Sequence, residues 1–184
     1  MNSLSHSEKS MQILRSLNLA ILLFVGCGSD NFSNVAELTP MIKSAQNVQL
    51  HEGLPHPNND KKFFDSELKT AETTKRSGFY FYAKPITLKG ADAKALTQFV
   101  KSGKAFKAWT GEKKCGGFHP DFTATWTSPK GEVEIQFCFG CREAKLIHLN
   151  SSVRCDLTET AYNSLSEFLN PYHVHLPKTP AVRF

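Results

Sequence analysis

The sequence predicts an α+β domain with a mainly antiparallel sheet, a three-stranded meander and about three helices. Apolar and polar residues alternate over 122–127 and again over 132–139. The turn between them, Ser128-Pro-Lys-Gly131, has proline and glycine where a β-turn favours them, so the two strands are expected to pair antiparallel. Apolar residues recur at helical spacing in three other segments, which are 61–71, 90–101 and 157–169.

The first part of the domain is predicted to be a strand, a turn and a helix. Alternation in Asn47-Val-Gln-Leu-His-Glu52 indicates a short strand, and the glycine and prolines of 53–57 form the turn after it. Asp60 and the two asparagines before it offer an N-cap to the helix at 61–71. A weaker helical pattern lies upstream, near 35–42.

The middle of the domain is predicted to be an aromatic strand followed by a helix. The segment 77–83 is rich in phenylalanine and tyrosine, which is typical of a strand, and Pro85 ends this strand or marks it as an edge. The helix at 90–101 follows and is expected to stop at Ser102-Gly103. A short extended piece at 106–109 then leads toward the first cysteine of the domain.

The last part is predicted to complete the meander and add a helix. A third strand is expected at 143–149, and Asn150-Ser-Ser152 is expected to form the next turn. Asp156 is predicted to cap the last helix, with Glu159 as a capping-box-like partner. The tail at 173–184 contains prolines and is expected to be loose, with its histidines in solvent.

Composition bounds the class of protein. The 184 residues are 40% hydrophobic and 21% charged, which is enough apolar material for a folded core. The formal net charge is +5, but lysine and arginine are scattered singly or in pairs rather than along one stripe. Nucleic acid is therefore not expected as a partner.

The N-terminus carries an export pattern. Lys9 and Arg15 precede an apolar run at 17–25, which suits the core of a signal peptide and is shorter than the ~20 residues that span a bilayer. The run ends in Phe24-Val-Gly-Cys27, which resembles the lipobox of bacterial lipoproteins. In that family a cysteine is diacylated and becomes the first mature residue. Phe24 departs from the leucine that usually stands three positions before the cysteine.

This resemblance implies a signal peptide at 1–26. The composition and the predicted elements then give a tether at 27–45, an α+β domain at 46–175 and a loose tail at 176–184. Cys27 would carry the acyl chains, palmitate among them, and the lipid bilayer of the cell envelope would be its partner on the extracytoplasmic side. More than one acyl chain gives stable anchoring. The alternative is an ordinary secretory peptide, or an uncleaved anchor, in which Cys27 has no role.

The chemistry of the domain is concentrated in two motifs, Cys115-Gly-Gly-Phe-His119-Pro and Cys138-Phe-Gly-Cys141. Because the strands at 122–128 and 132–139 run antiparallel, residues just before Phe122 should lie beside residues around Cys138. The two motifs are therefore predicted to meet at one place.

Two interpretations of this place remain open. A tetrahedral zinc site would use Cys115, His119, Cys138 and Cys141, with His56 as an accessory ligand. A structural disulfide would join Cys115 to Cys138 or to Cys141, with Cys155 as a further bridge partner, and the exported context favours oxidation. Zinc is the only cofactor expected, since no methionine cluster supports a copper site.

Catalysis at the same residues is a weaker hypothesis. A redox-active Cys138–Cys141 pair would end a strand, whereas thioredoxin-type pairs begin a helix that lowers the pKa of a thiol. No protease signature surrounds any cysteine, so a Cys–His nucleophile has little support and catalytic residues are unknown.

One further resemblance concerns most of the mature domain. His51-Glu-Gly-Leu-Pro-His56, followed by the two cysteine motifs, is similar to a group of uncharacterised bacterial exported proteins. The sequence thus predicts a membrane-anchored extracytoplasmic lipoprotein whose domain is structural or binds an unknown protein or small molecule without catalysis. A thiol-redox or metal-dependent enzyme that uses the same cluster is the alternative.

Overall fold

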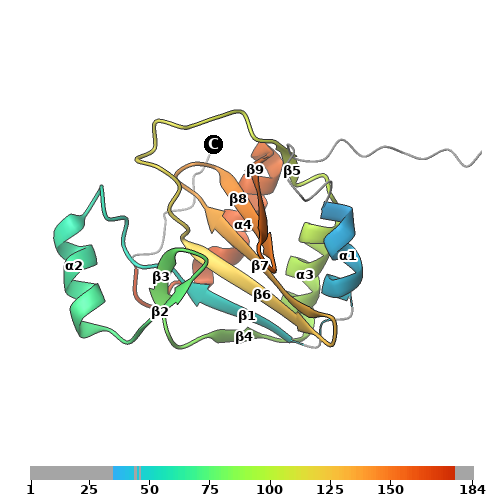
Figure 1. Cartoon of the computed structure of the whole chain (residues 1–184), viewed down its shortest axis with the longest axis horizontal. Coiled ribbons are helices and arrows are strands. Elements are labelled where there is room, and N and C mark those ends of the chain that lie inside the picture. Colours follow the sequence, from blue (N-terminus) through green and yellow to red (C-terminus); the bar gives the residue numbers. More distant parts are fainter. Residues whose placement is uncertain (1–34, 44, 46, 177–184) are drawn as a thin grey trace, which may run out of the picture.

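The computed structural model describes residues 35–43, 45 and 47–176. Seven strands form one antiparallel sheet, and they are β1 (Asn47–Glu52), β4 (Ile86–Leu88), β5 (Phe106–Ala108), β6 (Phe122–Ser128), β7 (Gly131–Cys138), β8 (Glu143–His148) and β9 (Ser151–Leu157). Their order across the sheet is β4-β1-β6-β7-β8-β9-β5. The consecutive antiparallel pairs from β6 to β9 confirm the α+β class and the meander (Figure 1).

Helices and a separate hairpin complete the described part. The helices are α1 (Val35–Lys43), α2 (Lys61–Thr70), α3 (Gly90–Lys101), α4 (Glu159–Leu169) and the short 3-10 helix η1 (Asn170–Tyr172), and the hairpin consists of β2 (Thr73–Arg76) and β3 (Phe79–Tyr82). Helices α1, α3 and α4 pack on one face of the sheet, whereas α2 stands apart from it (Figure 1). The segment around 35–42 thus belongs to the folded unit, because Leu38 and Ile42 are buried in its core.

The core lies between these three helices and the sheet. Alternate residues of β6 and β7 point into it, as the period of a strand requires, and Phe122, Trp126 and Phe137 are completely or almost completely buried there. Leu96 and Val100 of α3, together with Leu165 of α4, cover them from the helix side.

The opposite face of the sheet is polar and also buried. Thr123, Glu134 and Gln136 are nearly inaccessible to solvent on this face, and Glu143 and Asp156 continue it across β8 and β9. The β2–β3 hairpin covers one half, where the Ser77 hydroxyl donates to Glu134 at 2.7 Å. The connection between β5 and β6 covers the other half. Two covers therefore protect a polar surface that a single layer of helices would leave in solvent.

The prediction for residues 150–158 is wrong. The expected turn and helix start are a strand, β9, which pairs with β8 on one side and with β5 on the other. The helix cap is Thr158, whose side chain accepts a hydrogen bond from the backbone N–H of Ala161. Asp156 is a strand residue on the polar face, because pairing with two neighbours extends the chain past it.

The aromatic strand at 77–83 is shorter than predicted and belongs to a hairpin. Ser77 and Gly78 both have positive φ, 44° and 98°, and form its two-residue turn. Positive φ at both central residues matches the right-handed twist of the flanking strands. Residues 73–76 pair with 79–82, a partnership that the sequence pattern did not indicate.

The start of the tail is not loose. The Glu52 carboxylate accepts a hydrogen bond from the His173 ring at 2.8 Å and from three backbone N–H groups of 174–176 at 2.9–3.0 Å. His173 is buried and His175 stacks on Tyr82, with ring centroids 3.7 Å apart. The expectation that these histidines are solvated is therefore wrong for His173 and correct for His175, which is exposed although it stacks on Tyr82. Residues 177–184 lie outside the described part.

Candidate functional site

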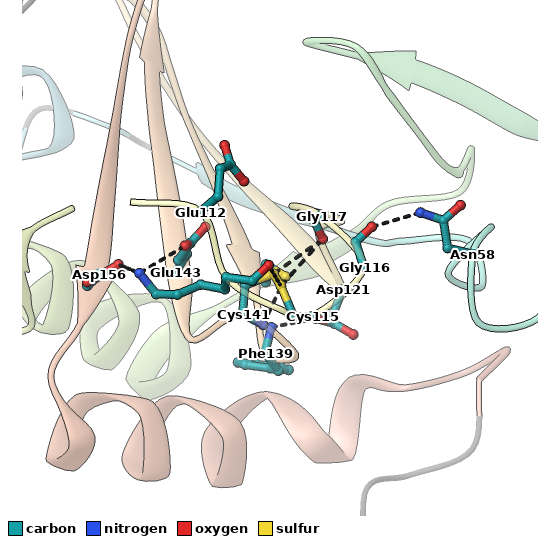
Figure 2. The surroundings of a disulfide bond; sticks show 12 residues. Asn58, Glu112, Cys115, Gly116, Gly117, Asp121, Phe139, Cys141, Glu143 and Asp156 are labelled. Atoms are coloured by element: carbon teal, nitrogen blue, oxygen red, sulfur yellow. Dashed lines mark hydrogen bonds and ion pairs between the residues drawn. A yellow bond between two sulfur atoms is a disulfide. The ribbon is translucent and has the colours of Figure 1, made fainter. Parts of the chain in front are cut away.

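The site is built on the connection between β5 and β6, residues 109–121, which we call the stapled loop. A disulfide joins Cys115 in this loop to Cys141 in the turn between β7 and β8, with an S–S distance of 2.06 Å and a Cα–Cα distance of 5.5 Å. Figure 2 shows the loop held over the ends of the strands by this bond. Of the two open interpretations, the structure contains the disulfide, and Cys141 is the partner.

Polar contacts fix the loop on both sides of the disulfide. On one side, the Lys113 ammonium contacts Asp156 at 3.0 Å and Glu143 at 3.4 Å. On the other side, the Asn58 side-chain amide donates to the Gly116 carbonyl at 2.8 Å (Figure 2). The Trp109 indole N–H also donates to Glu143, at 3.1 Å. The disulfide is thus one of several attachments rather than a single tie.

The contacts of Lys113 neutralise carboxylates that are buried on the polar face of the sheet. Glu143 is completely buried and also bonds the Arg154 guanidinium at 2.7 Å. Burial opposes the charged form of Asp156, but hydrogen bonds from Thr110 and Lys113 outweigh it and lower the pKa of this carboxyl below its usual value. A buried carboxylate needs such partners, since an unpaired one is strongly destabilising.

Backbone conformation and close packing favour glycine at position 116 of the stapled loop. Gly116 has a φ of 87°, and a Cβ atom on it would lie 3.0 Å from the Cε1 atom of His56. A side chain here would have to adopt a left-handed backbone and displace the imidazole. The Cys-Gly-Gly sequence therefore serves the geometry of the loop.

The prediction that the two cysteine motifs meet is confirmed. The Asp121 N–H donates to the Phe137 carbonyl at 2.8 Å, and the Phe139 N–H donates to the Asp121 carboxylate at 2.6 Å. These bonds place the end of the stapled loop beside the end of β7. The hairpin register is sufficient to explain the meeting, as the sequence indicated.

Cys138 is a thiol rather than a bridge partner. It is 2% exposed on β7, and the Cys141 N–H donates to its sulfur at 3.4 Å. Burial raises the pKa of this thiol to about 11, although nearby backbone N–H groups act in the opposite direction. A thiol with so high a pKa carries almost no thiolate at neutral pH.

His119 packs against aromatic rings. Its imidazole lies 4.8 Å from that of His56 and 6.4 Å from the ring of Phe79, measured between centroids. Burial, and then the neighbouring His56, lower the pKa of His119 to about 4, so it is neutral at neutral pH. Within the described residues, no group of three or more histidine, cysteine, aspartate or glutamate side chains is arranged to hold a metal ion.

Two residues expected as accessories have different places. His56 is at the site, because it contacts both His119 and the space beside Gly116. Cys155, expected as a further bridge partner, is disulfide-bonded and is completely buried in β9 on the helix-facing side of the sheet, opposite the stapled loop. Cys27, the expected lipidation residue, lies outside the described residues.

A pocket of about 440 Å³ opens beside the disulfide. It lies between the stapled loop, the β7–β8 turn and the start of α4, and both disulfide cysteines contribute to its wall. Its charged lining residues are Lys107, Lys113, Lys114, Arg142, Asp156 and Glu159. The sequence prediction missed these cations, since scattered lysines gave no sign that folding would gather them.

Arg142 has an unusual backbone for its residue type. Its φ is 55°, in the left-handed region, where a non-glycine residue costs roughly 1–2 kcal/mol. Its N–H donates to the Phe139 carbonyl at 3.2 Å, and its own carbonyl accepts from the Leu157 N–H at 2.8 Å. Its guanidinium lies over the ring of Tyr162, 4.6 Å from the centroid, which orients the side chain.

Comparison with protein-family models, curated proteins and solved structures found no match for this chain. The similarities to bacterial lipoproteins and to exported proteins therefore stay predictions. None of the helices in the described part of the chain is long and apolar enough to cross a membrane.

Proposed function

We propose that this chain is an extracytoplasmic lipoprotein, anchored to the cell envelope through acylated Cys27, whose domain binds a partner without catalysis. The observation that carries the proposal is the cross-link between Cys115 and Cys141. Structural disulfides persist in oxidising compartments and are rare in the cytosol. The disulfide thus agrees with the export pattern at the N-terminus, which is an independent feature of the sequence.

The binding role is supported by the arrangement around the disulfide. The cross-link and the ion pairs of Lys113 fix a loop whose surface forms one wall of a pocket. A fixed wall lowers the entropy that is lost when a ligand is bound. Binding therefore explains why a short connection carries so many attachments.

The alternative, a thiol-redox or metal-dependent enzyme using Cys115, His119, Cys138 and Cys141, has less support. The thiol beside the disulfide is buried and its pKa is raised to about 11, which opposes nucleophilic attack at neutral pH. His119 has a strongly lowered pKa and packs against His56, so it does not supply a nearby positive charge. A metal at this place would need Cys115 and Cys141 as thiolates, and hence reduction of their bond.

Expression of the full chain in a bacterium tests the anchor. We expect a palmitate analogue to label the wild type and not Cys27→Ser, and mass spectrometry to find Cys27 as the first mature residue. Mature protein that begins elsewhere, or that has Cys27 in a disulfide with Cys155, would overturn the lipid anchor.

The same preparation tests the alternative. Among Cys115, Cys138 and Cys141, we expect only Cys138 to react with a thiol reagent when the protein is unfolded without reductant. Stoichiometric zinc together with three free thiols in this set would instead favour the metal site.

A further inference from the structure

The pocket beside the disulfide has an excess of unpaired positive charge. Lys113 is already neutralised, because its ammonium contacts Asp156 and Glu143. Lys107, Lys114 and Arg142 have no ion-pair partner among the described residues. These three cations share the pocket with one unpaired carboxylate, Glu159, which leaves a net charge of +2.

The cation most closely tied to the fold is Arg142. It stands at a left-handed position of the β7–β8 turn that glycine would occupy without strain. Its stacking on Tyr162 holds the guanidinium in place, yet no carboxylate of the described residues pairs with it. A strained residue at the rim of a pocket suggests a role for the side chain rather than for the backbone.

The chemistry of these groups selects the ligand. A guanidinium offers a planar fork of N–H donors that fits two oxygens of a phosphate, and lysines add point charges to the same group. A net charge of +2 matches a phosphate dianion better than a single carboxylate. A volume of about 440 Å³ exceeds that of free phosphate, so room remains for the group to which the phosphate is attached.

We propose that this pocket binds a phosphomonoester, with Arg142 as the fork and Lys107 and Lys114 as the flanking charges. The proposal rests on the binding role proposed above, whose ligand it specifies, and it does not depend on lipid anchoring. The phosphate could belong to a soluble metabolite or to the headgroup of a lipid such as phosphatidic acid. Both sources present the same dianionic group to the same side chains.

Calorimetric titration of the full chain in nonionic detergent tests the proposal, with phenyl phosphate and short-chain phosphatidic acid as probes. We expect at least one probe to bind with a Kd of about 1 mM or tighter at low salt, and the affinity to fall as salt is added. Arg142→Gly should weaken binding about tenfold or more. The melting temperature of that variant should be maintained or raised, because glycine adopts the left-handed backbone.

A matched variant controls for net charge. Lys94 is exposed on α3 and does not line the pocket, so Lys94→Gln should leave the affinity unchanged. Preference for phenyl phosphate indicates a soluble ligand, and preference for phosphatidic acid indicates a headgroup. The proposal is wrong if neither probe binds, or if Arg142→Gly and Lys107→Gln both retain the full affinity. If neither probe binds but Cys27 is acylated, the phosphomonoester proposal is wrong and the proposed lipid anchor is unaffected.

Discussion

Replacing both cysteines of the Cys115–Cys141 disulfide with alanine should destabilise the domain by about 3.5 kcal/mol. The cross-linked residues are 26 apart in sequence, and freeing a loop of that length increases the entropy of the unfolded chain by this amount at 25 °C. For a domain of this size the change lowers the melting temperature by roughly 10 °C. The double variant removes both sulfurs, so no unpaired thiol is left at the cross-link.

Urea unfolding followed by tryptophan fluorescence measures this difference. Trp126 reports on the core, and Trp109 reports on the stapled loop that the disulfide holds. In a Cys155→Ala background, protein that keeps the Cys115–Cys141 disulfide should lose the same stability in reductant as the double variant, whereas reductant should not affect the double variant. The m-value should rise in both cases, because the unfolded chain without a cross-link exposes more surface.

A loss below about 1 kcal/mol would refute this reasoning, since it would mean that the unfolded chain gains little entropy without the cross-link, or that the folded loop gains a comparable amount. Unchanged stability of the Cys155→Ala protein in reductant would have the same meaning. Peptide mapping without reduction should find Cys115 linked to Cys141. A Cys138–Cys141 link would show that this cysteine pairing is wrong.

Three other perturbations test different parts of the structure. Burial alone would raise the pKa of Glu52, but the four hydrogen bonds it accepts lower it below the usual 4.5, so its contribution to stability is present above that pH and is lost as the pH falls through the lowered pKa. The protection factor for hydrogen exchange at the start of the C-terminal tail should therefore fall on acidification, and about tenfold in Glu52→Gln at neutral pH; equal protection factors would contradict the role given to the Glu52 hydrogen bonds. Cys138 should not react with iodoacetamide in the native protein at pH 7.5, because it is buried and its pKa is about 11, and rapid native labelling would disprove this. Gly53→Ala should cost about 1–3 kcal/mol because the new Cβ would lie 2.1 Å from the Pro120 carbonyl oxygen, whereas Gly140→Ala, with no atom within 4 Å, should be tolerated; equal stability of the two variants would count against this contact.

Local signals were enough to predict much of the fold. The strand at 47–52 and the helix at 90–101 have the predicted bounds, and the helix at 61–70 ends one residue earlier than expected. Alternation and a Pro-Gly turn predicted the β6–β7 hairpin, and the hairpin in turn predicted where the cysteine motifs meet. In each case the deciding interaction lies within a few residues of the signal.

Two of the errors have a shared physical cause, which is pairing between distant segments. Asp156 and Thr158 are both good helix caps, and only the pairing of β9 with β5 decides between them. Glu52 and His173 are 121 residues apart, so no local pattern could show that the tail is bound. The choice of Cys141 over Cys138 likewise depends on where the stapled loop places the Cys115 sulfur, since the Cys138 sulfur also contacts this loop, at the His119 backbone.

The hydrogen bonds between Glu52 and the start of the C-terminal tail also bear on how the domain would respond to a mechanical load. Strand β1 is paired on both edges, with β4 and with β6, and its last residue holds the start of the C-terminal tail. A pull on an N-terminal anchor would reach the sheet through α1 and then β1. Such a force would have to shear two ladders of hydrogen bonds at once rather than peel an edge strand. If the proposed lipid anchor holds the N-terminal end, the pairing of β1 on both edges would resist unfolding from that end.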